Sequence, residues 1–294
     1  MKWTSALTEF EAYLKLEKGL SPLSVSAYRR DVRQLADFHS DRSPLKITLQ
    51  DLRDFIAEYA KSGRSPRSQA RLISSIRSFY GYLIVEDLIE TNPAELLEAP
   101  KVSPKLPDTL SVEEIDAIIE AVDLSSRQGE RNRAILETLY GCGLRVTELI
   151  NLRLNDLYPK QGYLKVIGKG NKQRLVPLAD ITYKYIRIYV EEVRVHEKPK
   201  KGQENIIFLN NRGTKLSRVM IFKLVKEMTE AAGIRKNVSP HTFRHSFATH
   251  MIEGGADLRS VQEMLGHESI TTTEIYTHLD QFYLSTALKH HPRS

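Results

Sequence analysis

The first hundred residues carry hydrophobic side chains at helical spacing. One stripe lies close to the N-terminus, at Trp3, Leu7, Phe10 and Leu14. Two Ser-Pro pairs, at positions 21–22 and 65–66, match the N-cap and first-turn residues that begin helices, and a further helix is predicted over about residues 48–59. The pattern therefore predicts an all-helical N-terminal domain over residues 1–98.

The helix that begins at residues 65–66 has two contrasting faces. Apolar residues recur on one side, and the opposite side carries groups that donate to phosphate and no acidic residue: Arg67, Arg71, Ser74 and Ser78. On the helix before residue 48, three arginines lie off the apolar stripe: Arg29, Arg30 and Arg33. From the residues alone, the polar face of the helix at 65–66 fits DNA contact and an ordinary solvated face about equally well.

The sequence changes character after residue 91. Residues 92–110 hold four prolines and show no sustained periodicity. This composition is typical of a linker between domains, which we place at residues 99–110. Residues 111–294 then form a second domain.

Helical and strand-like patterns follow one another in the second domain. A capping box, Ser111 to Glu114, begins it. Longer helical runs are predicted at 131–140, 182–195 and 217–231, and strands at 163–167, 174–178 and 205–209. The predicted fold class is mainly α: a small N-terminal helical bundle and a larger α-rich domain with a small antiparallel β-sheet.

The composition indicates a basic protein that resides in a reducing compartment. Of the 294 residues 41% are hydrophobic, enough for two modest cores, and the formal charge of +6 favours an anionic partner. The one cysteine, Cys142, allows no internal disulfide and is predicted to lie in the core. No apolar run can span a bilayer and no signal-peptide pattern is present, so we expect a soluble, cytoplasmic protein.

The segment 239–278 concentrates the candidate chemistry. In order, it carries His241, Arg244, His267 and Tyr276. A Ser-Pro pair before His241 predicts a helix start that places His241 and Arg244 on one face near the positive helix end, where anions bind. Guanidinium and imidazole donors around a phosphate, with a phenol as nucleophile, suit phosphoryl transfer without a metal.

A metal site is not expected in this segment. His241 and His245 form an i,i+4 pair, but no H-E-x-x-H motif and no acidic third ligand accompany it. We therefore predict neither a metal nor another cofactor.

Two further cations precede the segment. Arg145 follows a turn bracketed by Gly141 and Gly143, beside an apolar helix. It is either a buried functional charge or the partner of Glu148 in a structural salt bridge. Lys169 lies on the hairpin turn GKGNKQ, where a solvated lysine is the ordinary interpretation.

Together these motifs resemble the tyrosine recombinase (lambda integrase) family, and within it the Xer site-specific recombinases. The motifs are GCGLRVTELINLRLNDL at 141–157, IGKGNKQRLVPL at 167–178, HTFRH at 241–245, LGH at 265–267 and TTTEIYTH at 271–278. The resemblance implies that residues 111–294 are a catalytic domain ending in an exchange helix, and that residues 1–98 contact DNA. It implies six catalytic residues: Arg145, Lys169, His241, Arg244, His267 and Tyr276.

The resemblance also implies a task for each residue. Tyr276 attacks a scissile phosphate, which gives a 3′-phosphotyrosyl link and a free 5′-hydroxyl. Arg145 and Arg244 hold the nonbridging oxygens, and His267 donates a hydrogen bond to the phosphate.

Proton transfer falls to the remaining two residues. His241 helps to take the phenol proton, which is needed because an ordinary phenol has a pKa of about 10. Lys169 protonates the departing 5′ oxygen. Since the phosphotyrosine conserves the bond energy, neither ATP nor a metal is required.

The function implied is site-specific DNA recombination that resolves chromosome dimers at cell division. The implied partners are double-stranded DNA with a specific recombination site, a second Xer-type recombinase or another copy of this chain in a synaptic tetramer, and a DNA translocase as activator. A mobile-element or phage integrase, a type IB topoisomerase and a DNA-binding protein without catalysis are the alternatives.

The C-terminal segment is the last element with a predicted role. Apolar residues at Leu279, Phe282, Tyr283 and Leu288 predict a terminal helix with one hydrophobic face. The resemblance implies that a neighbouring protomer buries this face, and packing on its own domain is the alternative.

Overall fold

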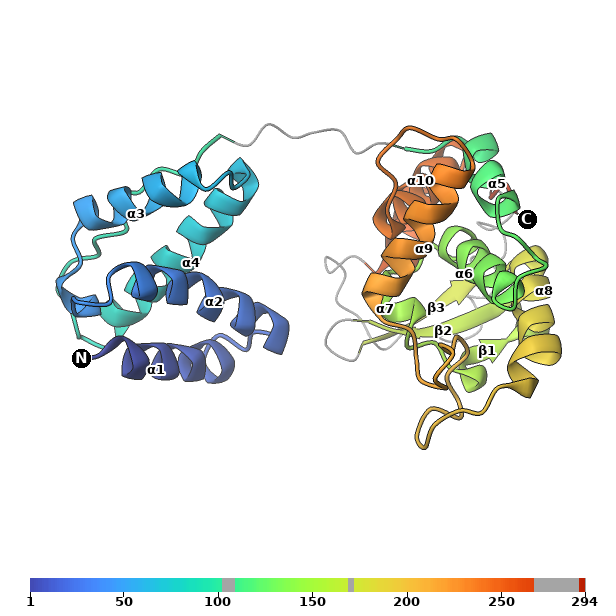
Figure 1. Cartoon of the computed structure of the whole chain (residues 1–294), viewed down its shortest axis with the longest axis horizontal. Helices are drawn as coiled ribbons and strands as arrows, with labels where there is room; N and C mark the ends of the chain where they lie inside the picture. Colours follow the sequence, from blue (N-terminus) through green and yellow to red (C-terminus); the bar gives the residue numbers. More distant parts are fainter. Residues whose placement is uncertain (102–108, 169–171, 267–290, 294) are drawn as a thin grey trace. The chain divides into compact units, whose positions relative to one another are not determined.

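The computed structural model describes residues 1–101, 109–168, 172–266 and 291–293. They divide into two compact units, Met1–Lys105 and Leu106–Ser294, each with its own hydrophobic core (Figure 1). Helices dominate both units, and the sheet found in the described residues is small and antiparallel. The predicted fold class is therefore confirmed.

The N-terminal unit is a helical bundle around an aromatic core. Its elements are α1 (Trp3–Leu16), α2 (Pro22–Phe38), a 3-10 turn (Pro44–Lys46), α3 (Leu49–Lys61) and α4 (Pro66–Val85). Phe10 of α1 and Phe79 of α4 are fully buried and meet edge to face, with ring centroids 5.3 Å apart. Helix α2 contacts both α1 and α4, so the two helices with candidate DNA-binding residues are neighbours.

The predicted helix starts in this unit are confirmed. Ser21 and Ser65 each accept a hydrogen bond from the backbone N–H three residues on, at 3.3 and 3.2 Å, and a proline opens the helix after each. Thr48 and Asp51 form a capping box at the start of α3. Local side-chain caps thus set three of the helix boundaries.

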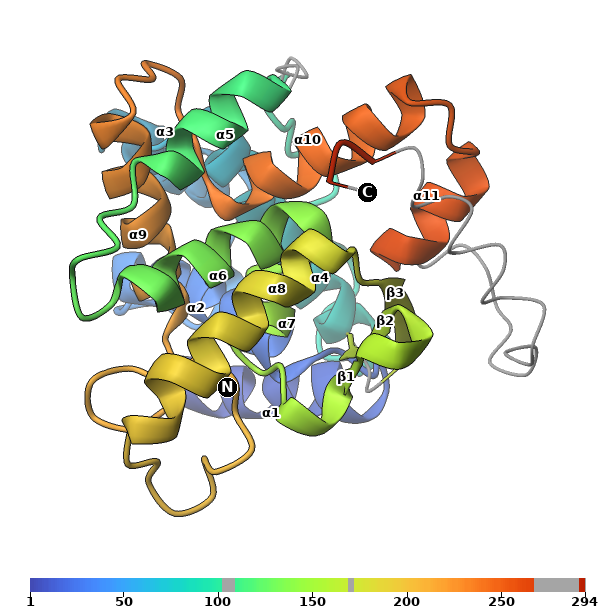
Figure 2. The same cartoon turned by 90° about the vertical axis from the view of Figure 1, so that its right-hand side faces the viewer.

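The C-terminal unit is organised around helix α6. Its helices are α5 (Val112–Glu120), α6 (Gly129–Gly141), α7 (Val146–Leu149), α8 (Asp180–Ile188), α9 (Arg218–Ala231), α10 (Pro240–Glu253) and α11 (Leu258–Leu265), with 3-10 turns at Leu154–Asp156 and Pro159–Gln161. Helix α6 contacts α5, α8 and α10, and Figure 2 shows it running between α5 and α8. A central, almost wholly buried helix gives the surrounding elements a fixed support.

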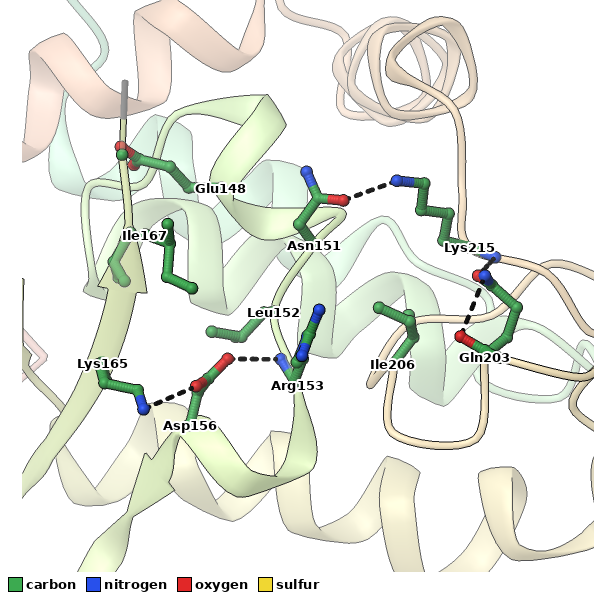
Figure 3. Close-up of a pocket in the computed structure, with 13 residues that line it drawn as sticks. Glu148, Asn151, Leu152, Arg153, Asp156, Lys165, Ile167, Gln203, Ile206 and Lys215 are labelled. Carbon is green, nitrogen blue, oxygen red and sulfur yellow. Dashed lines mark hydrogen bonds and ion pairs between the residues drawn. The ribbon is translucent and has the colours of Figure 1, made fainter. Parts of the chain in front are cut away.

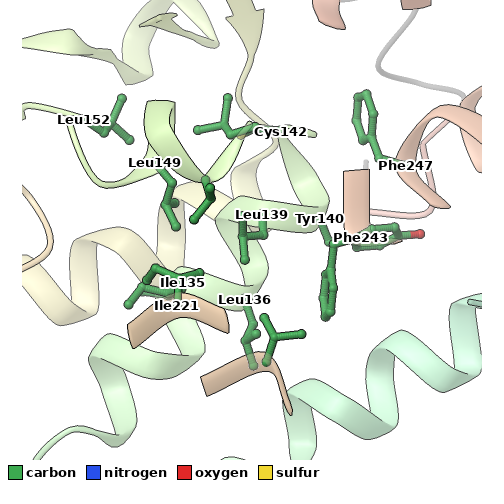
Figure 4. Close-up of a cluster of buried hydrophobic side chains, with 14 of the residues drawn as sticks. Ile135, Leu136, Leu139, Tyr140, Cys142, Leu149, Leu152, Ile221, Phe243 and Phe247 are labelled. Carbon is green, nitrogen blue, oxygen red and sulfur yellow. The ribbon is translucent and has the colours of Figure 1, made fainter. Parts of the chain in front are cut away.

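The core of this unit lies on both sides of α6. Leu136, Leu139 and Tyr140 of α6 are fully buried and lie near Phe243 and Phe247 of α10 (Figure 4). Cys142 belongs to the same core, as predicted. Burying each large side chain contributes roughly 1.5–3 kcal/mol, so α10 is held firmly against α6.

A three-stranded antiparallel sheet completes the unit, in the order β1 (Leu157–Tyr158), β2 (Tyr163–Ile167), β3 (Gln173–Pro177). In β2 and β3, Lys165 lies opposite Leu175 and Val166 lies opposite Arg174. The predicted hairpin is confirmed, with its second strand beginning one residue earlier than expected.

One sequence-based prediction is wrong and another is only partly confirmed. Residues 205–209 form no strand and make only isolated bridges, Arg153 to Ile206 and Leu209 to Lys215. The helix expected over 182–195 ends as α8 at Ile188 and continues as a π-helical turn (Tyr189–Val193) and a 3-10 turn (Arg194–His196).

The side chain of Arg194 accounts for the missing strand. Its Nε donates to the carbonyl oxygens of Ile206 and Ile207, at 2.8 and 3.1 Å. Since a buried guanidinium already satisfies these carbonyls, no neighbouring strand is needed to pair with them. In the described parts of the chain, no helix is long and apolar enough to cross a bilayer, and no cluster of His, Cys, Asp or Glu could hold a metal ion.

Candidate active site

A glycine turn between α6 and α7 places Arg145. Gly143 has φ +55°, and a Cβ atom there would lie 2.5 Å from Cδ1 of Phe247, so both the backbone conformation and the space require glycine. The turn brings the chain directly off the buried end of α6, and Arg145 becomes the N-cap of α7. The predicted emergence of Arg145 from a glycine turn beside a core helix is confirmed.

Glu148 lies at the centre of a cluster of arginines. Its side chain is 2% exposed, and its Oε2 accepts the backbone N–H of Arg145 at 2.8 Å. Its Oε1 accepts a hydrogen bond from the Arg145 guanidinium at 3.0 Å, and Nη1 of Arg244 lies 3.9 Å from Oε2. The salt bridge weighed as an alternative for Arg145 is therefore present, and 35% of the Arg145 side chain remains exposed.

Arg174 of β3 completes the cluster. It donates from Nη1 to Oε1 and from Nη2 to Oε2 of Glu148, each at 2.8 Å, in a two-point contact. Arg174 was not among the site residues predicted from the sequence. The available signal was its place on the strand, because Arg174 shares a buried face with Val176, and a charge on an apolar face needs a buried partner.

Helix α10 carries His241 and Arg244, and its predicted start is confirmed. Ser239 accepts the backbone N–H of Thr242 at 3.3 Å, and Pro240 opens the helix. His241 lies exposed in the first turn, while Arg244 is 8% exposed and donates from Nη1 to the carbonyl of Gly143 at 2.8 Å. The turn that orients Arg145 thus also accepts a hydrogen bond from Arg244.

The three arginines together hold the C-terminal end of α11, one carbonyl each. Arg174 Nε donates to Met264 O at 2.7 Å, Arg244 Nη2 donates to Leu265 O, and Arg145 Nη2 donates to Gly266 O at 3.1 Å. These are carbonyls at the negative end of a helix, where cations are stabilised. Gly266, in the left-handed conformation, ends α11 as predicted.

The electrostatic balance of the cluster is strongly positive, with three guanidinium groups around one carboxylate. Burial would raise the pKa of Glu148, but the hydrogen bonds and charge of Arg174, followed by those of Arg145, bring that pKa below its usual value. Burial, with the neighbouring Arg145 charge next in importance, lowers the pKa of Arg244 to about 10. Both groups are ionised at neutral pH, so the cluster can attract an anion.

Three of the six predicted site residues, Lys169, His267 and Tyr276, lie outside the described residues. Two of them, Lys169 and His267, directly follow described residues. Gly168 N donates to Lys172 O at 2.8 Å and closes the hairpin directly before Lys169, and Gly266, which Arg145 contacts, directly precedes His267.

A polar pocket of about 440 Å³ adjoins the cluster, with Glu148 and Gly168 in its lining (Figure 3). Lys165 and Asp156 pair along one wall at 3.6 Å, and Lys215 donates to Asn151 at 2.7 Å on another. Lys165 and Asp156 balance each other's charge, whereas Lys215 bonds to a neutral amide, so the pocket keeps a positive charge beside the arginine cluster.

The candidate DNA-binding residues of the N-terminal unit lie on α2 and α4. Ser78 is half-buried. The other six are exposed: Arg29, Arg30, Arg33, Arg67, Arg71 and Ser74. The Arg71 guanidinium pairs with Asp31, a fully buried carboxylate that also accepts from Ser75 at 2.8 Å. Arg29 lies 3.1 Å from Glu11, and in the described part of the chain no carboxylate pairs with Arg30 or Arg67.

The C-terminal residues 291–293 pack on the C-terminal unit itself. His291 is 2% exposed, and its ring lies 4.7 Å from the ring of Tyr140 and 5.1 Å from that of Phe247. Arg293 contacts Asp116 at 2.5 Å and the buried Glu137 at 3.3 Å. The predicted apolar helix face at 279–288 lies outside the described residues.

Comparisons with known proteins cover both units. The sequence profile of the phage integrase family matches residues 108–282, and the profile "Phage integrase, N-terminal SAM-like domain" matches residues 7–87. The chain is 41% identical over 292 residues to tyrosine recombinase XerD of Staphylococcus haemolyticus and of Staphylococcus aureus, an alignment that covers 98% of this chain and 99% of each relative.

Two solved structures of Xer recombinases are similar to this chain over most of its length. XerA recombinase is 31% identical with a TM-score of 0.51, and the alignment covers 99% of both chains. XerH recombinase bound to a palindromic difH substrate is 25% identical with a TM-score of 0.71, over 96% of this chain and 83% of that one. The chain belongs to the phage integrase family and is a tyrosine recombinase of the Xer type, an enzyme that cuts and rejoins DNA through a tyrosine.

Proposed function

We propose that this protein resolves chromosome dimers by cutting and rejoining DNA at one specific site, with Tyr276 as the nucleophile. The observation that carries the proposal is the joint attachment of Arg145 and Arg244 to Glu148 and to the end of α11. Two arginines fixed in this way present charge at a point directly before His267, in the segment that leads to Tyr276. This arrangement supports binding of a scissile phosphate beside a tyrosine.

In the proposed reaction Tyr276 attacks the phosphate and the 5′ oxygen leaves. Arg145 and Arg244 stabilise the negative charge of the pentacoordinate state, for which permanently charged, two-point donors are suited. His267 donates to the same phosphate, and His241, exposed in the first turn of α10, accepts the phenol proton.

Lys169 donates the proton that the leaving 5′ oxygen needs. Attack by a 5′-hydroxyl from another duplex then reverses the chemistry and completes strand exchange. Neither a cofactor nor a metal takes part.

Double-stranded DNA is the proposed partner of both units. In the N-terminal unit the donors of α2 and α4 contact the backbone: Arg29, Arg30, Arg33, Arg67, Arg71, Ser74 and Ser78. Their support is their exposure on two adjacent helices, together with relatives such as XerH, whose solved structure holds its difH substrate. DNA bound by the intact chain should therefore be released steeply as salt rises.

Protein partners follow from strand exchange between two duplexes. We propose a tetramer formed with a second Xer-type recombinase or with further copies of this chain, activated by a DNA translocase in the cytoplasm. The resemblance to XerD over 98% of the chain supports the chromosomal role over that of a mobile-element integrase.

The test is capture of the covalent intermediate. The protein is incubated with nicked fragments of its source genome, the mixture is denatured, and DNA that stays attached is sequenced. We expect one dominant site in the chromosome and no attachment by Tyr276→Phe, which should still bind that site. Attachment that survives in this variant contradicts the assignment of the nucleophile.

A second assay separates the chromosomal recombinase from its alternatives. Two duplexes with the captured site should exchange strands. If a supercoiled duplex is merely relaxed, the protein acts as a type IB topoisomerase, and if the captured site borders a mobile element, it acts as an integrase.

A further inference from the structure

We infer that Arg174 is a positioning residue for phosphate binding: it neutralises Glu148 so that Arg145 and Arg244 keep their charge for the scissile phosphate. The inference rests on the proposed function. It concerns a residue of β3 that has no place among the six catalytic residues and that need not touch DNA, since only 8% of it is exposed.

Of the three arginines, Arg174 makes the closest contact with the carboxylate of Glu148. Both of its terminal nitrogens lie 2.8 Å from Glu148, whereas Arg145 makes a single guanidinium contact at 3.0 Å and Arg244 stays 3.9 Å away. A planar two-point contact between guanidinium and carboxylate is the strongest arrangement of such a pair. The negative charge of Glu148 is therefore matched mainly from the side of the sheet.

The charge count shows what would change without Arg174. Glu148 has a 2% exposed side chain, and a carboxylate buried this deeply needs a cation beside it. If Arg174 is removed, Arg145 or Arg244 becomes the counter-ion of Glu148. One of the two charges intended for the phosphate is then already neutralised.

Arg174 is itself held in place from two directions. Its Nε donates to the carbonyl of Met264 at the end of α11, and its side chain carbons pack against Gly266, where a Cβ atom would lie 3.1 Å from its Cδ. The backbone of β3 fixes its other end through pairing with Val166. An arginine side chain held at both ends is preorganised, so Arg174 can stay paired with Glu148 while Arg145 and Arg244 bind the substrate phosphate.

The experiment measures single-turnover cleavage of the nicked captured site in two chemical forms. One carries the normal scissile phosphodiester, and the other carries a methylphosphonate, which lacks one nonbridging oxygen and its negative charge. The variant is Arg174→Gln. The matched control is Arg194→Gln, because Arg194 is also 8% exposed and also donates from Nε to a backbone carbonyl, at 2.8 Å, but contacts residues 204–207.

We expect Arg174→Gln to cleave the phosphodiester on the order of ten- to a hundred-fold more slowly than the unmodified protein, the range of a lost charged hydrogen bond. On the neutral methylphosphonate, which needs less positive charge, the deficit should shrink to a few-fold. Arg194→Gln should show the same deficit, large or small, on both substrates. Equal deficits of Arg174→Gln on both substrates overturn the inference.

A second pair of variants covers the case in which Arg174→Gln fails to fold. Glu148→Gln and the double variant Glu148→Gln/Arg174→Gln contain no unpaired buried carboxylate. Since Arg174 has no charge to neutralise once Glu148 is gone, the two variants should cleave within about three-fold of each other. A difference of ten-fold or more contradicts the inference. Absence of cleavage by the unmodified protein instead contradicts the proposed function, so the two failures are distinct.

Discussion

The guanidinium of Arg145 donates a hydrogen bond to Glu148, three residues further on, and another to the carbonyl of Gly266, 121 residues further on. One side chain thus joins the start of α7 to the end of α11. The same contact fixes the point from which the chain continues to His267. Any change that moves Gly266 should therefore disturb phosphate binding as well as the local backbone.

Substitution of Gly266 tests this connection. In Gly266→Ala the methyl group would lie 3.1 Å from Cδ and 3.3 Å from Nε of Arg174, and the residue would keep φ +65° at a cost of roughly 1–2 kcal/mol. We expect covalent complex to form on the order of ten-fold more slowly, because the arginine cluster must shift. Single-turnover cleavage of the captured site measures the effect.

Gly233→Ala is the matched control for Gly266→Ala. Gly233 has φ +71°, but nothing lies within 4 Å of the added methyl group. Both variants should melt a few degrees lower than the unmodified protein, and Gly233→Ala should keep its cleavage rate. If both variants lose activity equally, backbone strain explains the loss and the arginine cluster is not involved.

Helix boundaries and the general layout were predictable from sequence because local interactions set them. The Ser-Pro starts at residues 21–22, 65–66 and 239–240 need only a side-chain oxygen and a fixed φ, and each appears as predicted. The glycine stop of α11 is equally local. Such features can be read from a few neighbouring residues.

The arrangement around Glu148 was not predictable in the same way. The contact with Arg174 joins residues 26 apart, and the arginine contacts with α11 join residues up to 121 apart, so only the fold reveals them. The strand expected at 205–209 failed for a similar reason, because the side chain of Arg194 hydrogen-bonds to carbonyl groups of this segment. Side-chain contacts between residues distant in the sequence are the common cause.

Docking of residues 291–293 should weaken in acid. Burial, followed by the charges of Arg293 and His250, lowers the pKa of His291 to about 3 from an ordinary 6.5. Docked His291 is therefore neutral, and docking is complete above pH 6.5 and weakens by up to about ten-fold per pH unit as the pH falls from 6.5 toward 3.

A fluorescent label at the C-terminus measures this docking. Because Cys142 is buried, Ser294→Cys supplies the reactive thiol, and label anisotropy should be lower at pH 5 than at pH 7.5. In His291→Phe, which keeps an aromatic ring between Tyr140 and Phe247, most of the difference should disappear. Equal anisotropy at both pH values in the parent protein would falsify the assignment of His291 as the titrating group.

Truncation separates the two possible sites for the terminal segment. Removal of residues 282–294 should reduce strand exchange between duplexes much more than binding of a single site, because a neighbouring protomer is expected to bury the apolar face at 279–288. Arg293→Ala is the comparison, since it removes contacts with Asp116 and Glu137 that lie within the chain. Strand exchange by the truncated protein at the rate of the full chain would show that the segment serves its own domain.

Lys169 is the proposed residue with the most ordinary alternative, a solvated lysine on the turn that Gly168 and Lys172 close. As general acid it protonates the departing 5′ oxygen. A sulfur in that position leaves readily as a thiolate and needs no proton. Lys169→Ala should therefore cleave the normal site about a hundred- to ten-thousand-fold more slowly, but should cleave the 5′-thio site almost normally.

Arg145→Ala provides the contrast for the thio substrate. In the proposed mechanism Arg145 stabilises charge on the nonbridging oxygens whichever atom leaves, so sulfur should restore the activity of Arg145→Ala much less. If Lys169→Ala is equally slow on both substrates, Lys169 positions DNA and donates no proton. If it is unimpaired on both, Lys169 is a solvated turn residue and the leaving oxygen takes its proton from elsewhere.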